Sequence, residues 1–307
     1  MTSSPKTTSE PLDFLSRQFA RYLRSEGKAD RTRHLYVETL RFYTEWLTEQ
    51  GISADLSALT RDNVLDWLAS LRDRKLADNT VSSRWRHLRR FVKWAVDEGI
   101  LDANPLGGIH VDTPQPTLVP VLSDEDLSAL IKACKGNEFL ERRDEAMLRL
   151  LIDCGIRVSE LVSIDLDHLD MDGEMVTVTG KGNRRRAVYF GGKTGLALDR
   201  YLRVRRHHRY ASDQALFLGE RGRFSTDGVR DRVKVRARQA GLPPAKVHPH
   251  AFRHSWAHDW RLNGGDSEDL KRLAGWRSDA MLARYGASAA DARAREAAKR
   301  LRRGDRI

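Results

Sequence analysis

Apolar residues recur at helical spacing along most of this chain, and that periodicity limits its fold more than any other feature. Four such stretches occupy the first hundred residues: Leu12, Leu15, Phe19, Tyr22 and Leu23; Tyr36, Leu40, Tyr43 and Leu47; Val64, Trp67, Leu68 and Leu71; and Val81, Trp85, Leu88, Val92 and Ala95. Gly51 and Gly99 end the second and fourth stretches, and Thr60 can cap the third. We therefore predict an all-helical N-terminal domain over residues 11–103. The Ser-, Thr- and Pro-rich residues 1–10 are expected to be disordered.

The helical period stops at a segment rich in Pro, Gly and Thr, residues 104–120, which we interpret as a linker. The second domain is expected over residues 121–288. It opens at Ser123, which forms with Asp126 the pattern of a capping box for a helix through Lys135.

Helices also dominate the second domain, with one exception. The segments Met175–Thr179 and Arg185–Phe190 alternate in the manner of β-strands around the turn GKGNR and predict a hairpin. Further helices are expected near residues 194–209, 225–240, 250–262, 266–274 and 278–285. The tail, residues 289–307, begins with an Ala-, Arg- and Glu-rich helix. The fold class is therefore mainly α with a small β-hairpin or sheet.

A formal net charge of +11 and a pI near 9.9 favour polyanionic partners, nucleic acid first. Membranes are the rival polyanion, but no stretch approaches the roughly 18 apolar residues of a spanning helix. The N-terminus lacks the apolar core of a signal peptide, so a cytoplasmic location is expected. The two cysteines, Cys134 and Cys154, fall on apolar helix stripes and are interpreted as reduced core residues.

The fourth helix carries a row of cations away from its apolar stripe, which is either a solvated face or a surface that faces a DNA groove. The candidate DNA-binding residues on this helix are Arg84, Arg86, Arg89, Arg90 and Lys93. Two further candidates, Arg184 and Arg230, lie in the second domain.

Several residues of the second domain could carry chemistry, although each alone has an ordinary interpretation. Arg157 lies at a helix junction, and Lys181 lies in the glycine-flanked hairpin turn. His250 and Arg253 are separated by one helical turn. Tyr285 follows Leu282 at helical spacing and would usually be a core aromatic.

The ordered motifs GIRVSEL, GKG, HAFRH and AGWRSDAMLARY resemble those of the tyrosine recombinases, also called phage integrases. The segment NTVSSRWRHLRRFVKWAVDEGILDANP resembles the end of that family's core-binding domain. The resemblance implies a SAM-like core-binding domain followed by a catalytic domain with the DNA breaking-rejoining fold. It assigns catalytic roles to Arg157, Lys181, His250, Arg253, Trp276 and Tyr285. Trp276 departs from the histidine of many members; its indole can donate a hydrogen bond but cannot transfer a proton at neutral pH.

These residue types suit attack on a phosphodiester. Arg157 and Arg253 can each offer a bidentate fork to non-bridging oxygens. A free tyrosine has a pKa of about 10, so Tyr285 needs a base, for which His250 is the candidate. Lys181 would protonate the departing 5′ oxygen. The resemblance implies a 3′-phosphotyrosine, with no ATP, metal or other cofactor.

A metal site is the alternative for one helix, because His250, His254 and His258 repeat every four residues. No carboxylate or thiolate has matching spacing, so we expect no metal and interpret His254 as a hydrogen-bonding residue behind the site.

Two other functions stay open: a type IB topoisomerase with the same site, and a non-catalytic DNA-binding protein. The resemblance further implies a tetramer on two double-stranded DNA sites that passes through a Holliday junction. The C-terminal helix would dock on a neighbouring protomer, or else fold back on its own domain. A partner recombinase or directionality factor is also expected. The setting is either chromosome-dimer resolution of the Xer type or a mobile element, and Trp276 with RYGASAADARAREAAKR favours the latter.

Overall fold

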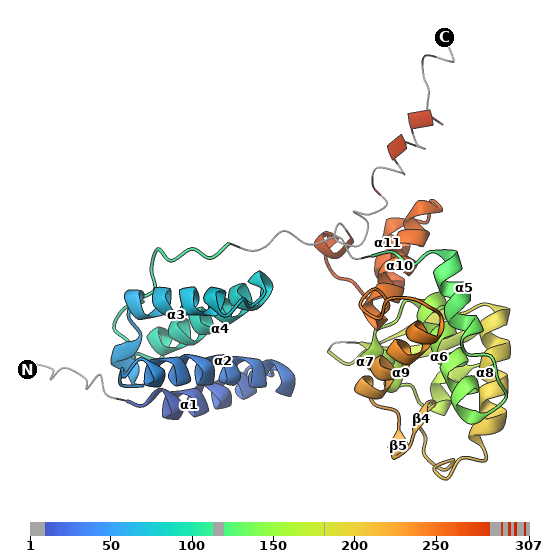
Figure 1. Ribbon diagram of the computed structural model, residues 1–307, viewed down its shortest axis with the longest axis horizontal. Helices are drawn as coiled ribbons and strands as arrows, with labels where there is room; N and C mark the ends of the chain where they lie inside the picture. The colour runs from blue at the N-terminus through green and yellow to red at the C-terminus, as the bar shows by residue number, and fades with distance from the viewer. Residues whose placement is uncertain are drawn as a thin grey trace, which may run out of the picture. The chain divides into compact units, whose positions relative to one another are not determined.

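The computed structural model describes residues 10–112, 120–180 and 182–282, together with residues 290, 294–295, 298–299 and 304. The chain divides into two units, Met1–Gln115 and Pro116–Ile307, and each is described by itself (Figure 1). No helix in these described ranges has both the length and the apolar character needed to cross a membrane.

The described part of the N-terminal unit consists of helices that pack through their apolar stripes. Its elements are α1 (Leu12–Ser25), α2 (Asp30–Glu49), the 3-10 turn η1 (Leu56–Ala58), α3 (Arg61–Asp73) and α4 (Asp78–Asp97). The four predicted helices are therefore confirmed, and their stripes form one core in which Tyr22 and Tyr36 are only partly buried. As predicted, the side chain of Thr60 caps α3 by accepting a hydrogen bond from the backbone N–H of Asn63.

In the structure, the first half of the segment expected to be a linker packs partly against the N-terminal unit. Leu106 and Ile109 are buried in the N-terminal core. Nη1 of Arg61 also donates a hydrogen bond of 2.7 Å to the carbonyl oxygen of Gly107. Two anchoring side chains are too few to produce a period, so the sequence pattern did not reveal this packing. Residues 113–119 lie outside the described residues.

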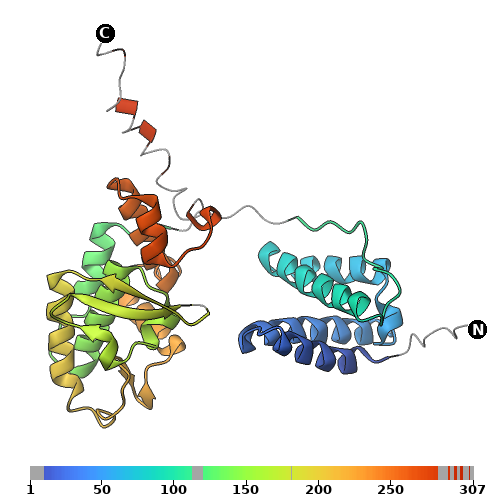
Figure 2. The ribbon, with the colours of Figure 1, turned by 180° about the vertical axis from the view of Figure 1, so that it is seen from behind.

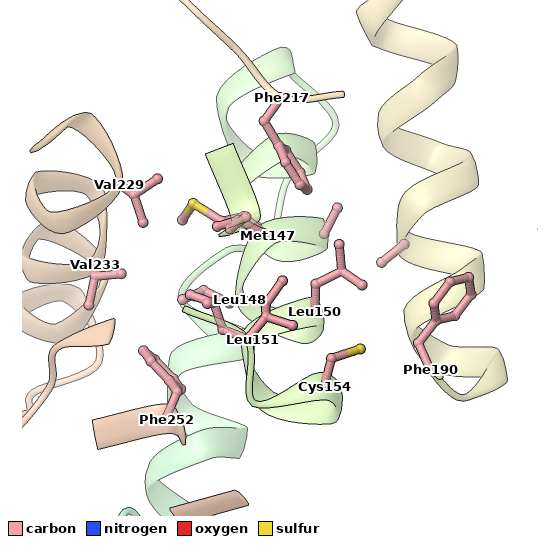
Figure 3. Close-up of a cluster of buried hydrophobic side chains, with 14 of the residues drawn as sticks. Met147, Leu148, Leu150, Leu151, Cys154, Phe190, Phe217, Val229, Val233 and Phe252 are labelled. Atoms are coloured by element: carbon pink, nitrogen blue, oxygen red, sulfur yellow. The ribbon is translucent and has the colours of Figure 1, made fainter. Parts of the chain in front are cut away.

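The second unit is built around α6 (Phe139–Cys154), which contacts α8 and α10. Met147, Leu148, Leu150 and Leu151 of α6 are all fully buried in the core (Figure 3). The other helical elements are α5 (Asp124–Lys132), α7 (Val158–Val162), η2 (Leu166–His168), α8 (Gly192–Arg205), α9 (Thr226–Gln239), α10 (Pro249–Leu262) and α11 (Ser267–Ala274). The predicted capping box of Ser123 and Asp126 is confirmed, although α5 ends at Lys132, three residues early.

The predicted hairpin is confirmed as strands β2 (Met175–Gly180) and β3 (Arg184–Tyr189), and Figure 2 shows the two side by side. The prediction of only one hairpin was wrong. The strand β1 (Leu169–Asp170) extends the sheet in the order β1-β2-β3, and β4 (Leu218–Gly219) pairs with β5 (Gly222–Arg223) in a second sheet. Each added strand has two residues, which is too short for alternation to be visible in a sequence.

Both cysteines are buried and free, as predicted. Burial raises the pKa of the Cys134 thiol to about 12 and also raises the pKa of Cys154. These thiols therefore stay protonated and form part of the core.

Candidate functional site

Arg157 stands where α6 gives way to α7. Gly155 ends α6 in the left-handed conformation, with φ 54°, and Arg157 is the N-cap residue of α7. The side chain of Arg157 is 38% exposed, and its Nη1 donates a hydrogen bond of 2.8 Å to Oε1 of Glu160. One guanidinium nitrogen of Arg157 is thus held by Glu160, while part of the side chain is exposed to solvent.

Glu160 is a buried acid that the sequence analysis did not assign to the site. Its side chain is 2% exposed. Each carboxylate oxygen accepts two hydrogen bonds: Oε1 from Nη1 of Arg157 and Nη1 of Arg186, and Oε2 from the Arg157 backbone N–H and Nη2 of Arg186. Burial opposes ionisation of Glu160, but these hydrogen bonds and charges outweigh it and lower its pKa. The spacing of Arg157 and Glu160 in GIRVSEL is compatible with an ion pair between them. Arg186 lies 26 residues after Glu160, so no local spacing indicates its contact.

His250 and Arg253 lie on the first turns of α10. This helix begins at Pro249, and Nδ1 of His248 accepts a hydrogen bond from the backbone N–H of Ala251. That bond requires Nδ1 to be unprotonated. Burial lowers the pKa of His248 and so also favours the neutral ring. His250 is exposed at this helix start, whereas Arg253, one turn later, is buried.

The Arg253 guanidinium joins three segments of the chain. Its Nη1 donates a hydrogen bond of 2.7 Å to the Gly155 carbonyl, and its Nη2 donates one of 2.6 Å to the Ala274 carbonyl. Its central carbon also lies 5.2 Å from the ring centroid of Trp276. Beyond the phosphate-binding role that the resemblance implies, Arg253 therefore fixes the end of α11 against the end of α6.

One pocket of about 380 Å³ brings together three of the predicted catalytic residues and Arg230, a predicted DNA-binding residue. Arg157, His250 and Arg253 line it, with Arg230 and Lys234 of α9 and with Val158, Ser159, Val247, His248 and Pro249. The four cations face no acidic residue among those lining the pocket, which favours an anion. Arg230 and Lys234 each form an ion pair along α9, with Asp227 and Asp231 respectively.

A second pocket of about 620 Å³ shares Arg157 with the first. It is lined by the hairpin residues Gly180, Gly182, Arg184, Arg185 and Arg186, and by Lys271, Arg272, Gly275, Trp276, Arg277, Ser278 and Met281. The predicted residues Trp276 and Arg184 thus lie here rather than beside His250. Lys181 and Tyr285 lie outside the described residues.

Among the residues that the structure describes, one group could hold a metal ion. Asp165, Asp167 and His168 have potential ligand atoms within 4.8 Å of one another. Asp165 is already engaged by Nη2 of Arg223. The histidines 250, 254 and 258 do not form such a group; His254 is buried while His250 is exposed.

The cations of α4 fall into two kinds. Arg86, Arg89 and Lys93 are exposed and line a groove of about 770 Å³ between α4 and residues 104–111. Arg90 also lines the groove, but both oxygens of Glu26 accept hydrogen bonds from its Nη2. The Arg84 guanidinium lies 4.0 Å from the centroid of the Phe42 ring. Arg84 and Arg90 are therefore partly committed to contacts within the unit.

Two family models match the chain. The model described as Phage integrase family matches residues 120–292, and that described as Phage integrase, N-terminal SAM-like domain, matches residues 15–101. With the mostly helical structure, these matches confirm the fold class expected from the sequence.

Curated relatives and solved structures agree with these models. The chain is 34% identical over 276 residues to the tyrosine recombinase XerC of Mycobacterium tuberculosis, covering 87% of this chain and 92% of the relative. It is 32% identical over 278 residues to XerC of Ralstonia pickettii, covering 82% and 84%. Its fold is similar to that of the XerH site-specific recombinase bound to a palindromic difH substrate, with TM-score 0.76, 14% identity and coverage of 97% and 99%. It is also similar to a lambda integrase tetramer bound to a Holliday junction, with TM-score 0.69, 18% identity and coverage of 90% and 77%.

Proposed function

The chain belongs to the phage integrase family and is a site-specific tyrosine recombinase, and we propose from this premise that Arg157, His250 and Arg253 hold and activate the DNA phosphate that it cuts. The observation that supports this assignment most is the cationic pocket itself. Segments far apart in the sequence place two guanidinium groups and an exposed imidazole around one space. Arginines stay charged at all relevant pH and can stabilise the charge that builds on the non-bridging oxygens during attack.

In the proposed reaction, the phenol oxygen of Tyr285 attacks the phosphorus while His250 accepts the phenol proton. The bond between phosphorus and the 5′ oxygen breaks, and Lys181 supplies a proton to that oxygen. The products are a 3′-phosphotyrosine and a free 5′ hydroxyl. Attack by a 5′ hydroxyl of another strand reverses the step, so neither ATP nor a metal is needed.

Trp276 supports the site in a different way from a histidine. It lines the second pocket beside the hairpin and contacts the Arg253 guanidinium through its ring. Its indole nitrogen is a hydrogen-bond donor and has no basic lone pair. We propose that it contacts a phosphate oxygen and transfers no proton.

The assembly is a further part of the proposal. Four copies would act on two double-stranded sites through a Holliday junction, by analogy with the lambda integrase tetramer that is bound to such a junction. Residues 289–307 would dock on the neighbouring protomer, and a partner recombinase or directionality factor would take part. We propose that the protein acts on DNA in the cytoplasm.

The experiment first captures the target sequence. Purified protein is incubated with fragmented genomic DNA of the organism that carries the gene, and DNA that stays bound after SDS denaturation is sequenced. Synthetic nicked duplexes of the captured sequence should then form an adduct with the wild type and none with Tyr285→Phe, which should still bind. An adduct that persists in Tyr285→Phe would refute the assignment.

A two-site plasmid separates the remaining alternatives. We expect recombinant circles; relaxation of supercoils without recombinants would instead indicate a topoisomerase. The captured loci also separate the two settings, because a single chromosomal locus indicates dimer resolution, whereas the ends of an element indicate integration.

A further inference from the structure

Arg186 of β3 joins three segments around the candidate site. Its side chain is 14% exposed, and Arg186 lies opposite Val178 in the register of the hairpin. Nη1 and Nη2 donate hydrogen bonds of 3.0 and 2.9 Å to the two oxygens of Glu160, and Nε donates one of 2.6 Å to the Leu273 carbonyl. One guanidinium therefore connects the hairpin with α7 and with the last turn of α11.

The contact with Glu160 affects Arg157 directly. Four donors saturate the Glu160 carboxylate, two from Arg157 and two from Arg186. Without Arg186, each oxygen of the buried carboxylate would lose one donor, and the Arg157 guanidinium would turn to replace these donors. Arg186 thus leaves the rest of the Arg157 guanidinium available to the two pockets that Arg157 lines.

The contact with Leu273 affects the chain that leads to Trp276. Arg186 holds the Leu273 carbonyl, and Arg253 holds the next one, at Ala274. Gly275 then turns the chain with φ 66°, and a Cβ added there would lie 3.2 Å from Nη1 of Arg186. Two arginines from different elements therefore fix consecutive carbonyls immediately before Gly275, which leads to Trp276.

We propose that Arg186 is a positioning residue for DNA cleavage, which sets Arg157 through Glu160 and the α11 end through Leu273, and so locks both to the hairpin that carries Lys181. The inference rests on the proposed function. A lysine cannot replace the arginine, because an ammonium group lacks the planar fork that serves a carboxylate and a carbonyl together.

The test uses Arg186→Lys in the full chain, with single-turnover cleavage of the captured nicked duplex at saturating protein. We expect a cleavage rate at least about tenfold lower, because small misplacements of catalytic groups are costly, with DNA affinity within about twofold of wild type. Arg223→Lys is the matched control. Arg223 also contacts one carboxylate, of Asp165, and one carbonyl, of Val162, and it lines neither pocket. The Arg223→Lys variant should cleave the duplex at the wild-type rate.

A second variant separates positioning from a loss of folding. Glu160→Gln keeps the shape of the side chain, and each variant is assayed below its melting temperature. If Arg186 acts through Glu160, the double variant Arg186→Lys/Glu160→Gln should cleave about as slowly as the slower single variant. The proposal would be overturned if the double variant lowered the cleavage rate by the product of the two single reductions. A wild-type cleavage rate in Arg186→Lys would also overturn it. Failure of the wild type itself to form the adduct would instead count against the proposed function.

Discussion

Nη1 of Arg253 donates a hydrogen bond of 2.7 Å to the carbonyl oxygen of Gly155, 98 positions earlier in the chain. This bond requires α10 to approach the end of α6 closely. Gly155 permits the approach because it has no side chain: a Cβ there would lie 2.3 Å from the indole of Trp256 on α10. The position of a predicted phosphate-binding arginine therefore depends on a glycine at the end of another helix.

Gly155→Ala is predicted to destabilise the protein and to slow cleavage. Its φ of 54° costs about 1 kcal/mol for a residue with a Cβ, and displacing Trp256 adds about 1–3 kcal/mol. Gly99→Ala is the matched control, because Gly99 has φ 67° and open space around its Cβ position. Urea unfolding should show a larger loss for Gly155→Ala by at least about 1 kcal/mol. Equal losses would mean that Trp256 yields without cost.

Asp144 is predicted to be essential for the stability of the second unit. Its fully buried carboxylate is paired with Arg143, Arg232 and Arg236. Asp144→Asn should cost about 3–5 kcal/mol, because it removes the nearest counter-charge of the buried Arg143 and Arg236. The control is Asp199→Asn, which breaks the exposed pair with Arg203 and should cost less than about 0.5 kcal/mol. Similar unfolding free energies for the two variants would contradict this account.

The ion pairs of Glu160 predict a specific pH dependence. The folded-state pKa of Glu160 is lowered from its ordinary value of 4.5, mainly by Arg186 acting against the opposing effect of burial. The carboxylate therefore contributes stability above about pH 4.5, and this contribution is lost as the pH falls through the lower folded value. The gap in unfolding free energy between wild type and Glu160→Gln should be constant near neutrality and narrow below pH 4.5. A gap that does not change with pH would show that Glu160 is not ionised differently in the two states.

The two kinds of cation on α4 predict different effects on DNA binding. Arg86→Ala and Arg89→Ala should each lower the slope of log affinity against log salt by about 0.9, the value for one phosphate contact. Arg90→Ala should lower it less, because Glu26 already neutralises Arg90. The measurement is a salt titration with a short duplex of the captured sequence. Equal slopes for wild type and all three variants would mean that this face is only solvated.

Local signals in the sequence were sufficient for the helices and their caps. The stripes of α1 to α4, the cap at Thr60 and the capping box at Ser123 depend on residues a few positions apart, so they are visible in a sequence. The packing of Leu106 was not visible, because two isolated apolar residues set no period.

The candidate site likewise has one part that local sequence signals indicate and another part that they do not. Arg157, His250 and Arg253, which the motifs singled out, line one pocket. The bond from Arg186 to Glu160 and the carbonyl contacts of Arg253 join residues 21 to 98 positions apart. Such contacts exist only once the chain has folded, and no local pattern encodes them.

The most direct test of the central claim identifies the residue that becomes joined to DNA. The trapped complex with a nicked duplex is digested with nuclease and trypsin, and the peptide that keeps a nucleotide is sequenced by tandem mass spectrometry. We predict a single modified peptide, with the nucleotide joined through its 3′ phosphate to Tyr285. A nucleotide on any other residue, or a complex that SDS dissociates completely, would contradict the account.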